Sequence, residues 1–312
     1  MTTSLLTKRL SYSSILTFHK CPRKFYLERH QTSRDEKSIH LAYGSSMGVG
    51  MQEVMKNSSY ETVIFAAFLA WDLDLEEEDV KGKKSFWDAI HAINQFASEF
   101  WPSMQRSGWQ LLHLNDKATD EFGFKINLPD GFYLLGYLDG ILFNKNNNEV
   151  RVLETKTTKY TNVHEALYSN SWQGIGYSIV LDELVASGKL ESFSSLEVLY
   201  LVLKSTAKEF ELFPFKKPPS VKAGWLYNMH REVQAIKACE DEDYWPKYGE
   251  SCWDYASFKP CQFYGVCDMH PKHLFLKDEE AFNEVALAKE KEANEKCFVM
   301  NMEDIVARRL EA

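Results

Sequence analysis

Two apolar runs joined by a polar turn constrain the fold of this chain more than any other feature. FYLLGYLDGILFN and VRVLETKTTKY are rich in aromatic and β-branched residues, and the segment NKNNNE lies between them. Runs of this kind, bounded by turn residues, are typical of neighbouring β-strands. TDEFGFKINL before them, and SSLEVLYLVLKS and EFELFPF after them, have the same character. Together these segments predict a sheet.

Helical patterns surround the predicted strands. Apolar residues recur at helical spacing in residues 11–30, in SFWDAIHAINQFASEFW, and in segments beginning near Gly44, Trp172, Ser220 and Lys277. We therefore predict an α/β fold with a central mixed sheet flanked by helices and an N-terminal helical region. No repeat or low-complexity linker interrupts residues 1–276, which we expect to form a single domain. It would include a helical insertion at about 50–115, a cysteine-rich closing segment at 245–270, and a charged helical tail at 277–312.

Charge and hydropathy limit the class of protein. The chain has 312 residues and a formal charge of -9, which argues against a protein that coats nucleic acid nonspecifically. Acidic residues concentrate at Asp72–Asp79 and beyond Lys277, while basic residues cluster near the N-terminus, at Lys8, Arg9, Lys20, Arg23, Lys24 and Arg29. That cluster could be a local track for phosphates or a solvated face. No apolar stretch is long enough to span a bilayer, so we expect a cytoplasmic protein with no membrane partner.

The chemistry is expected in GYLDGILFNKNNNEVRVLETKTTK. If its two runs form a hairpin, Glu154 and Lys156 share one face of the second strand, and Asp139 on the first strand can meet them. Two carboxylates and the backbone carbonyl of Thr155 suit a hard cation such as Mg²⁺ or Mn²⁺. A lysine beside them can orient or help deprotonate an attacking water and offset charge on a phosphate. These parts together predict phosphodiester hydrolysis.

An exposed strand edge with alternating charges is the alternative interpretation of a Glu-x-Lys pair. Glu154, however, follows the apolar run VRVL, where a solvent-facing charge would be unusual, and a strand ending in Gly-x-x-Asp precedes it. These two features agree on a catalytic site at Asp139, Glu154 and Lys156.

At these residues the chain resembles the PD-(D/E)XK nuclease superfamily. Gly136-Tyr-Leu-Asp139, then Val152-Leu-Glu154-Thr-Lys156-Thr, then Gln173-x-x-x-Tyr177, is most similar to the RecB-like exonuclease branch, which includes phage exonucleases and the nuclease of CRISPR adaptation. The resemblance implies a restriction-endonuclease-like core and runs from about Ser11 to Cys267. It also implies that Gln173 and Tyr177 lie on a helix beside the active site and help to hold DNA.

One departure from the family pattern concerns the metal. The branch usually has a histidine in a Gly-x-x-x-His helix, whereas here Gly44 is followed by Gly48 at the histidine position. Either Gln52, one helical turn further on, reaches toward the metal, or the site works with Asp139 and Glu154 alone. The stronger interpretation of Gln52 is an ordinary helix residue.

Four of the six cysteines form a second pattern. Cys21 lies near the N-terminus, and Cys252, Cys261 and Cys267 lie near the C-terminus. In a cytosolic protein such a group suggests a metal, either a [4Fe-4S] cluster or structural Zn²⁺, although buried cysteines without a ligand are also compatible with it. The wide spacing, and the resemblance to RecB-like nucleases whose chain ends are joined by a [4Fe-4S] cluster, favour iron-sulfur. We interpret Cys239 and Cys297 as packing residues.

These observations predict a Mg²⁺- or Mn²⁺-dependent deoxyribonuclease, expected to be an exonuclease acting on linear single- or double-stranded DNA in phage or bacterial DNA processing or recombination. A homo-oligomer or a replication or recombination partner is possible. One alternative is a DNA-binding or partner-binding subunit on the same fold with weakened catalysis. Another is an iron-sulfur electron-transfer protein, although no redox partner surface is recognisable in the sequence.

Overall fold

The computed structural model describes residues 8–30, 39–73, 75, 84–115, 117–158, 160–191, 193, 195–205, 208–254, 259–269 and 279–311. The chain forms two compact units. Unit 1 takes in Met1–Asp35, Gly123–Gly136 and Ala223–Ala312, and unit 2 takes in Glu36–Phe122 and Tyr137–Lys222. The sequence predicted one domain over 1–276 and a separate tail, whereas the C-terminal segment here belongs to unit 1. Most of the acidic run Asp72–Asp79 lies outside the described residues.

A five-stranded mixed sheet forms the centre of unit 2. Its order is β10-β9-β8-β7-β2, with β2 (Trp109–Leu111), β7 (Gly140–Asn144), β8 (Glu149–Thr158), β9 (Ser195–Lys204) and β10 (Glu209–Phe215). Strands β7 and β8 form the predicted antiparallel hairpin, whereas β8 and β9 run parallel. The predicted mixed sheet is therefore confirmed. A further small hairpin in this unit pairs β3 (His113–Leu114) with β4 (Lys117–Ala118).

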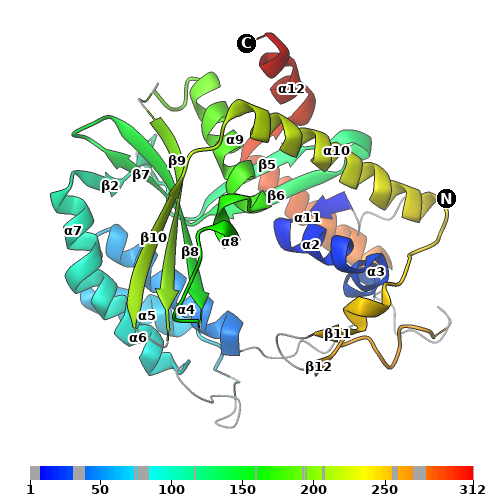
Figure 1. Ribbon diagram of the computed structural model, residues 1–312, viewed down its shortest axis with the longest axis horizontal. Coiled ribbons are helices and arrows are strands. Elements are labelled where there is room, and N and C mark those ends of the chain that lie inside the picture. Colours follow the sequence, from blue (N-terminus) through cyan, green and yellow to red (C-terminus); the bar gives the residue numbers. More distant parts are fainter. Residues whose placement is uncertain are drawn as a thin grey trace. The chain divides into compact units, whose positions relative to one another are not determined.

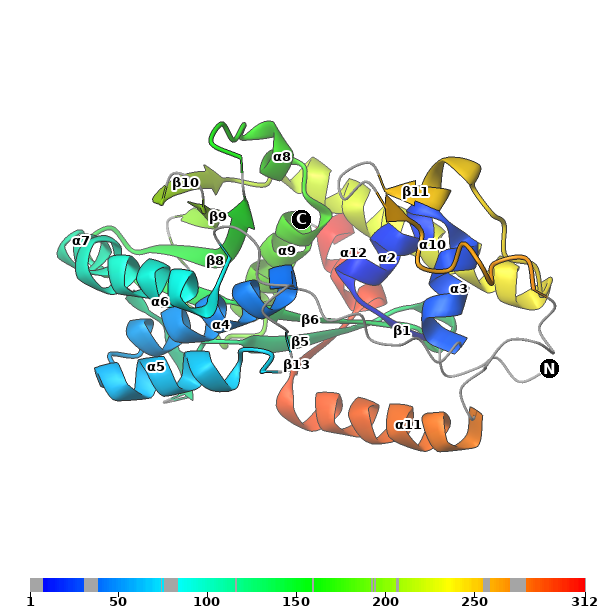
Figure 2. The ribbon, with the colours of Figure 1, turned by 90° about the horizontal axis from the view of Figure 1, so that it is seen from below.

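Helices cover both faces of this sheet. Figures 1 and 2 show four of them on one side, namely α4 (Ile39–Met55), α5 (Tyr60–Leu69), α6 (Phe86–Gln95) and α7 (Trp101–Arg106), with a π-helical turn at Phe96–Phe100 before α7. Their apolar side chains share a core with Leu199, Leu201 and Leu203 of β9. Because side chains alternate along a strand, Tyr200 points to the other face, where α9 (Trp172–Ala186) packs. The short helix α8 (Ala166–Ser169) precedes α9.

Unit 1 is built on a second, four-stranded sheet. The order is β1-β6-β5-β13, with β1 (Arg9–Leu10), β6 (Tyr133–Leu138), β5 (Phe122–Asn127) and β13 (Phe298–Asn301). Gly136 in β6 lies where a Cβ would come within 2.4 Å of the Phe124 ring, so a side chain at this position would displace the ring. The helices of this unit are α2 (Tyr12–Lys20), α3 (Pro22–His30), α10 (Pro219–Asp241, from Ala223 onward), α11 (Glu279–Lys296) and α12 (Met302–Glu311). Short elements occur at Pro129–Gly131, Gly249–Cys252, β11 (Trp253–Asp254) and β12 (Lys259–Pro260).

Two predicted elements are interrupted in the structure. The helix expected over residues 11–30 is divided into α2 and α3 at Cys21, whose backbone is extended at φ -165° and ψ 106°. Pro22 follows Cys21, and a proline disfavours helical backbone in the residue before it. The strand expected through FYLLGYLDGILFN is divided into β6 and β7 at Asp139. Among the described residues, no helix is long and apolar enough to cross a membrane.

Candidate active site

The break between β6 and β7 places Asp139 next to the centre of β8. Gly140 pairs with Leu153, so Asp139 comes opposite the start of the Glu154-Thr155-Lys156 segment, as the hairpin predicted. Thr155 fixes the carboxylate, because its backbone N and its Oγ1 each donate a hydrogen bond of 2.7 Å to Asp139 Oδ2. No described residue donates a hydrogen bond to Asp139 Oδ1. That oxygen remains available to a ligand.

Glu154 is a buried carboxylate with one unsatisfied oxygen. The residue is 2% exposed, and Lys156 Nζ donates to its Oε1. Its Oε2 is also buried and has no hydrogen-bond partner among the described residues. Burial, together with the negative charge of Asp139, raises the pKa of Glu154 to about 7, against the opposing effects of Lys156 and Tyr177. A buried carboxylate oxygen of this kind needs a proton or a cation.

Lys156 is held in place by a chain of hydrogen bonds from α9. Its Nζ donates to Gln173 Oε1 at 3.1 Å, and Gln173 Nε2 donates to the Tyr177 hydroxyl at 2.6 Å. That hydroxyl donates to the backbone carbonyl of Tyr137 at 2.8 Å. Burial disfavours the ammonium group, but the negative charges of Glu154 and Asp139 and the hydrogen bond to Glu154 outweigh it and raise the pKa of Lys156. Lys156 is therefore a cation at neutral pH.

The close packing of α9 on β9 holds the residues of this hydrogen-bond chain in place. A Cβ at Gly174 would meet the Tyr200 hydroxyl at 2.8 Å, so the glycine lets the helix approach the sheet closely. Tyr177 is 1% exposed, which makes a direct contact between its side chain and DNA difficult. The resemblance implied that Gln173 and Tyr177 help to hold DNA. In this geometry, both residues position Lys156.

A cleft of about 540 Å³ has Asp139, Glu154, Thr155 and Lys156 on one side. The opposite wall is a face of α4 that presents four residues spaced four apart, namely His40, Gly44, Gly48 and Gln52. A Cβ built on Gly44 or Gly48 has no neighbour within 4 Å, so space is open at the position where the family pattern has histidine. The glycine face therefore leaves the approach to Asp139 and Glu154 unobstructed.

Gln52 lines the cleft as proposed but contacts the backbone. The residue is 8% exposed, and its Nε2 donates to the Asp139 carbonyl oxygen at 3.4 Å. Its amide is thus directed at the main chain beside the carboxylate. His40 and Glu121 also line the cleft, and the sequence had not assigned either to the site. His40 lies four residues before Gly44, and this spacing could have indicated in the sequence that it belongs to the site. Glu121 lies in a turn, and no comparable pattern indicates its place.

The four cysteines of the predicted cluster all belong to unit 1. Cys261 N donates to the Cys252 carbonyl oxygen at 2.8 Å, and Cys261 and Cys267 pack against the buried side chains of Leu27 and Phe263. Cys21 is buried at the end of α2. Burial, together with the negative charge of Asp268, raises the pKa of the Cys267 thiol against the effect of Arg23. Within the described ranges, no three His, Cys, Asp or Glu side chains are gathered closely enough to hold a metal ion.

The basic residues near the N-terminus are largely engaged inside unit 1. Arg23 Nε donates to the Cys267 carbonyl oxygen at 3.3 Å, and Lys24 Nζ lies 3.8 Å from Glu28. The guanidinium of Arg29 lies 3.7 Å from the centre of the Phe25 ring, and burial lowers its pKa to about 10. Three of the six basic residues therefore make contacts within unit 1, and the phosphate track considered from the sequence stays a prediction.

Comparison with known proteins identifies the family. Among solved structures, a candidate exonuclease from Eubacterium rectale is 12% identical, with 79% of this chain and 86% of that chain covered and a TM-score of 0.47. The protein SSO0001 is 13% identical, with 81% of this chain and 95% of that chain covered and a TM-score of 0.30. Both scores are too low to support an argument about this chain. No protein with a curated description matches the sequence. The model of the PD-(D/E)XK nuclease superfamily matches residues 9–268, most of the chain and all of the site around Asp139, Glu154 and Lys156, so the chain belongs to this superfamily.

Proposed function

We propose that the protein is a DNA nuclease that depends on a divalent metal. The observation that carries this proposal is the buried Glu154, whose Oε2 has no partner among the described residues and which lies with Asp139 and Lys156 on one cleft. A carboxylate that is costly to ionise without a cation, next to a second carboxylate and a fixed ammonium group, fits a metal-assisted hydrolase. Superfamily membership supports the same chemistry, because PD-(D/E)XK nucleases typically use divalent metals such as Mg²⁺.

Asp139 and Glu154 are the proposed ligands of Mg²⁺ or Mn²⁺, together with the backbone carbonyl of Thr155. Hard cations of this kind take oxygen ligands and retain several waters. When bound, the cation would lower the pKa of a water and polarise the phosphoryl oxygen. The fit is supported by two carboxylate oxygens, Asp139 Oδ1 and Glu154 Oε2, that accept no hydrogen bond from a described residue. Gln52 is a weaker candidate for a ligand, because its amide nitrogen is directed at the Asp139 carbonyl.

Lys156 is proposed to stabilise negative charge on the scissile phosphate. The raised pKa keeps its ammonium group charged, so it acts as an electrostatic partner of the phosphate and as a hydrogen-bond donor that orients the attacking water. Gln173 and Tyr177 hold the ammonium in its position through the hydrogen bonds described above. Because catalytic groups must be held within a fraction of an ångström, loss of this support should slow cleavage.

The finer assignment is an exonuclease of the RecB-like branch, acting on the ends of linear single- or double-stranded DNA in phage or bacterial DNA processing or recombination. It is supported by the order of the three motifs, ending in Gln173-x-x-x-Tyr177 on a helix beside the site. A homo-oligomer or a replication or recombination protein is a possible partner of such an enzyme.

A [4Fe-4S] cluster bound by Cys21, Cys252, Cys261 and Cys267 is a further part of the proposal, with structural Zn²⁺ as the alternative. Four thiols within one unit offer suitable donor chemistry for either metal, and they would have to draw together on binding, because no three described side chains of this kind are gathered at one point. The cluster would join the two ends of the chain, because Cys21 and Cys267 are far apart in sequence. Binding energy would then contribute to the free energy of folding.

The test is digestion of end-labelled linear single- and double-stranded DNA beside a closed circle. Protein purified without oxygen is compared with its Lys156→Ala variant, with and without Mg²⁺ or Mn²⁺. We expect metal-dependent loss of linear DNA that falls by at least about 100-fold in the variant, the usual range for a positioned proton-transfer or charge-stabilising group. Survival of the circle would establish an exonuclease, whereas its cleavage would establish an endonuclease.

The open space at Gly48 favours a second candidate, a DNA-binding or partner-binding subunit with weakened catalysis. A site that lacks the family's histidine would bind the metal less tightly, and no described neighbour comes within 4 Å of a Cβ built on Gly48. Absence of cleavage by folded, metal-loaded protein that still binds DNA would establish this function in place of the nuclease.

A further inference from the structure

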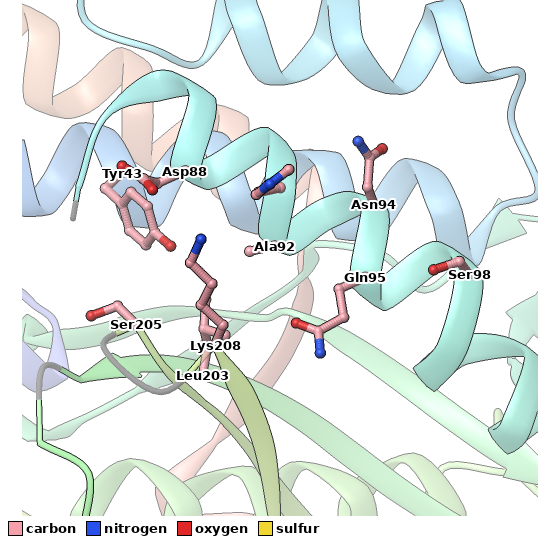
Figure 3. Close-up of a pocket in the computed structure, with 10 residues that line it drawn as sticks. Tyr43, Asp88, Ala92, Asn94, Gln95, Ser98, Leu203, Ser205 and Lys208 are labelled. Atoms are coloured by element: carbon pink, nitrogen blue, oxygen red, sulfur yellow. The ribbon is translucent and has the colours of Figure 1, made fainter.

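A second hollow in unit 2 lies beside the helix that lines the cleft. It has a volume of about 360 Å³ and lies between α6 and the end of the β9–β10 hairpin. Figure 3 shows Tyr43, Ser205 and Lys208 at one end of it and Gln95 and Ser98 toward the other. The hollow contains polar and charged groups, in contrast to the apolar core of this unit, which makes a polar ligand the natural occupant.

Lys208 and Asp88, which line this hollow, both have hydrogen-bonding capacity left for a ligand. Within the described part of the chain, no hydrogen bond or ion pair engages the Lys208 ammonium. Asp88 accepts hydrogen bonds from Ser85 N and Oγ through Oδ2, which leaves Oδ1 without a described donor. Burial alone would raise the pKa of Asp88, but the hydrogen bonds from Ser85 and the nearby charge of Lys208 lower it. The hollow thus presents a cation and a carboxylate acceptor together.

The hollow lies beside the end of β8, the strand that carries Glu154 and Lys156. Ser205 N donates to the Thr158 carbonyl at 2.8 Å, and Ser205 Oγ donates to the same oxygen at 3.0 Å. Thr158 lies two residues beyond Lys156 on β8, a rise of about 7 Å. In the parallel register of β8 and β9, Thr157 of the cleft pairs with Leu203, so the cleft lies beside the hollow on this face of the sheet. Tyr43, which lines it, is next to Gly44 in the cleft wall.

We propose that this hollow binds one nucleotide of the substrate strand, close to the scissile phosphate, with Lys208 on its phosphate and Asp88 accepting from an amino group of its base. The inference rests on the proposed function for the identity of the strand. A lysine contacts a phosphate without sequence preference, whereas a carboxylate selects bases that carry an amino donor. Cytosine has such a donor where thymine has a carbonyl oxygen. The site should therefore favour cytosine over thymine.

Binding without a divalent metal tests the phosphate contact separately from cleavage. Fluorescence anisotropy with a labelled single-stranded oligonucleotide in EDTA gives the affinity at several salt concentrations. Lys208→Ala should weaken binding several-fold and reduce the slope of log affinity against log salt by about 0.7, the value for one lost phosphate contact on a single strand. Lys145→Ala is the matched control, because Lys145 is an exposed lysine on the turn at the opposite end of β8.

Matched oligo-dC and oligo-dT test the base contact. Wild-type protein should bind oligo-dC more tightly than oligo-dT, and Asp88→Asn should remove most of that difference, because an amide oxygen is a weaker acceptor than a carboxylate. Asparagine still offers Ser85 an oxygen to cap α6, and circular dichroism verifies that the variant is folded. An Asp88→Gln variant, which keeps a capping-box side chain at this position, provides a second measurement if Asp88→Asn is unfolded, and it too should reduce the difference between the two oligonucleotides.

The outcomes separate this inference from the nuclease itself. Cleavage by wild-type protein, combined with equal affinity and equal salt slope in the Lys208→Ala and Lys145→Ala variants, would overturn the nucleotide site and leave the nuclease standing. Loss of binding in Lys208→Ala by a protein that cleaves nothing would support the site and reject the nuclease. If Lys208→Ala weakens binding of free dCMP but not of the oligonucleotide, the ligand is a free nucleotide and the strand assignment is overturned.

Discussion

The raised pKa of Glu154 makes the stability of the metal-free protein depend on pH in a defined way. Glu154→Gln removes the ionisable group and keeps nearly the same volume. The variant therefore reports what it costs to ionise a carboxyl that is 2% exposed and close to Asp139. Glu149→Gln is the matched control, because it removes a carboxylate from the partly exposed start of the same strand.

The magnitude follows from the pKa of the folded protein. An ordinary glutamate titrates at 4.5, and Glu154 titrates at about 7. Between these values the folded state binds a proton that the unfolded state has released, so the free energy of unfolding falls as pH rises. At about 1.4 kcal/mol for each pH unit, the wild type should lose about 3 kcal/mol relative to Glu154→Gln between pH 4 and pH 8. The pair with Lys156 does not alter this difference, because the lysine stays charged over this range.

Urea denaturation of both proteins at half-unit steps of pH measures the difference directly. Without metal, the two stability curves should diverge through the window from 4.5 to about 7, whereas Glu149→Gln should run parallel to wild type. Mg²⁺ should stabilise the wild type most above pH 7, because it binds the ionised carboxylate, and should leave Glu154→Gln nearly unchanged. If the free energies of unfolding of wild type and Glu154→Gln change in parallel with pH, ionisation of Glu154 does not destabilise the metal-free fold. That result would refute the argument that a metal offsets this cost.

Three further predictions concern the cleft, the hydrogen bonds of α9 and the cysteines. Gly48→His should lower the Mn²⁺ concentration that gives half-maximal cleavage, because its side chain enters open space facing the carboxylates, and an unchanged metal titration would contradict this. Tyr177→Phe should lower the free energy of unfolding by about 0.5–1.5 kcal/mol in urea titrations, because it removes the hydrogen bond that the Tyr177 hydroxyl donates to the Tyr137 carbonyl, and should also slow cleavage; a variant as stable as wild type would show that this hydroxyl is unimportant. Cys21→Ser should reduce the bound iron or zinc measured by elemental analysis and lower the melting temperature, whereas Cys239→Ser should change neither; equal metal contents would remove Cys21 from the cluster.

Local patterns in the sequence were sufficient to predict that Asp139, Glu154 and Lys156 lie together. Glu154 and Lys156 lie two apart on a strand, and the turn NKNNNE brings the strand of Asp139 back beside them, so short-range geometry alone brings all three together. The alternation of strands and helices similarly predicted the mixed sheet and its covering helices. Pro22 carried enough information to predict the break at Cys21, since its effect on the preceding residue is local.

Only the tertiary structure decided what surrounds these residues. Strand β13 pairs with β5 across more than 170 residues of sequence, which no local pattern predicts. The hydrogen bond from Lys156 to Gln173, and the glycine face of α4 opposite the carboxylates, likewise join segments that are distant in the chain. The pKa of Glu154 depends on its burial and on the charge of Asp139, which the strand order and the packing of unit 2 bring about. Residue identity and strand periodicity therefore determined which groups could react, and long-range packing determined how they are charged, held and approached.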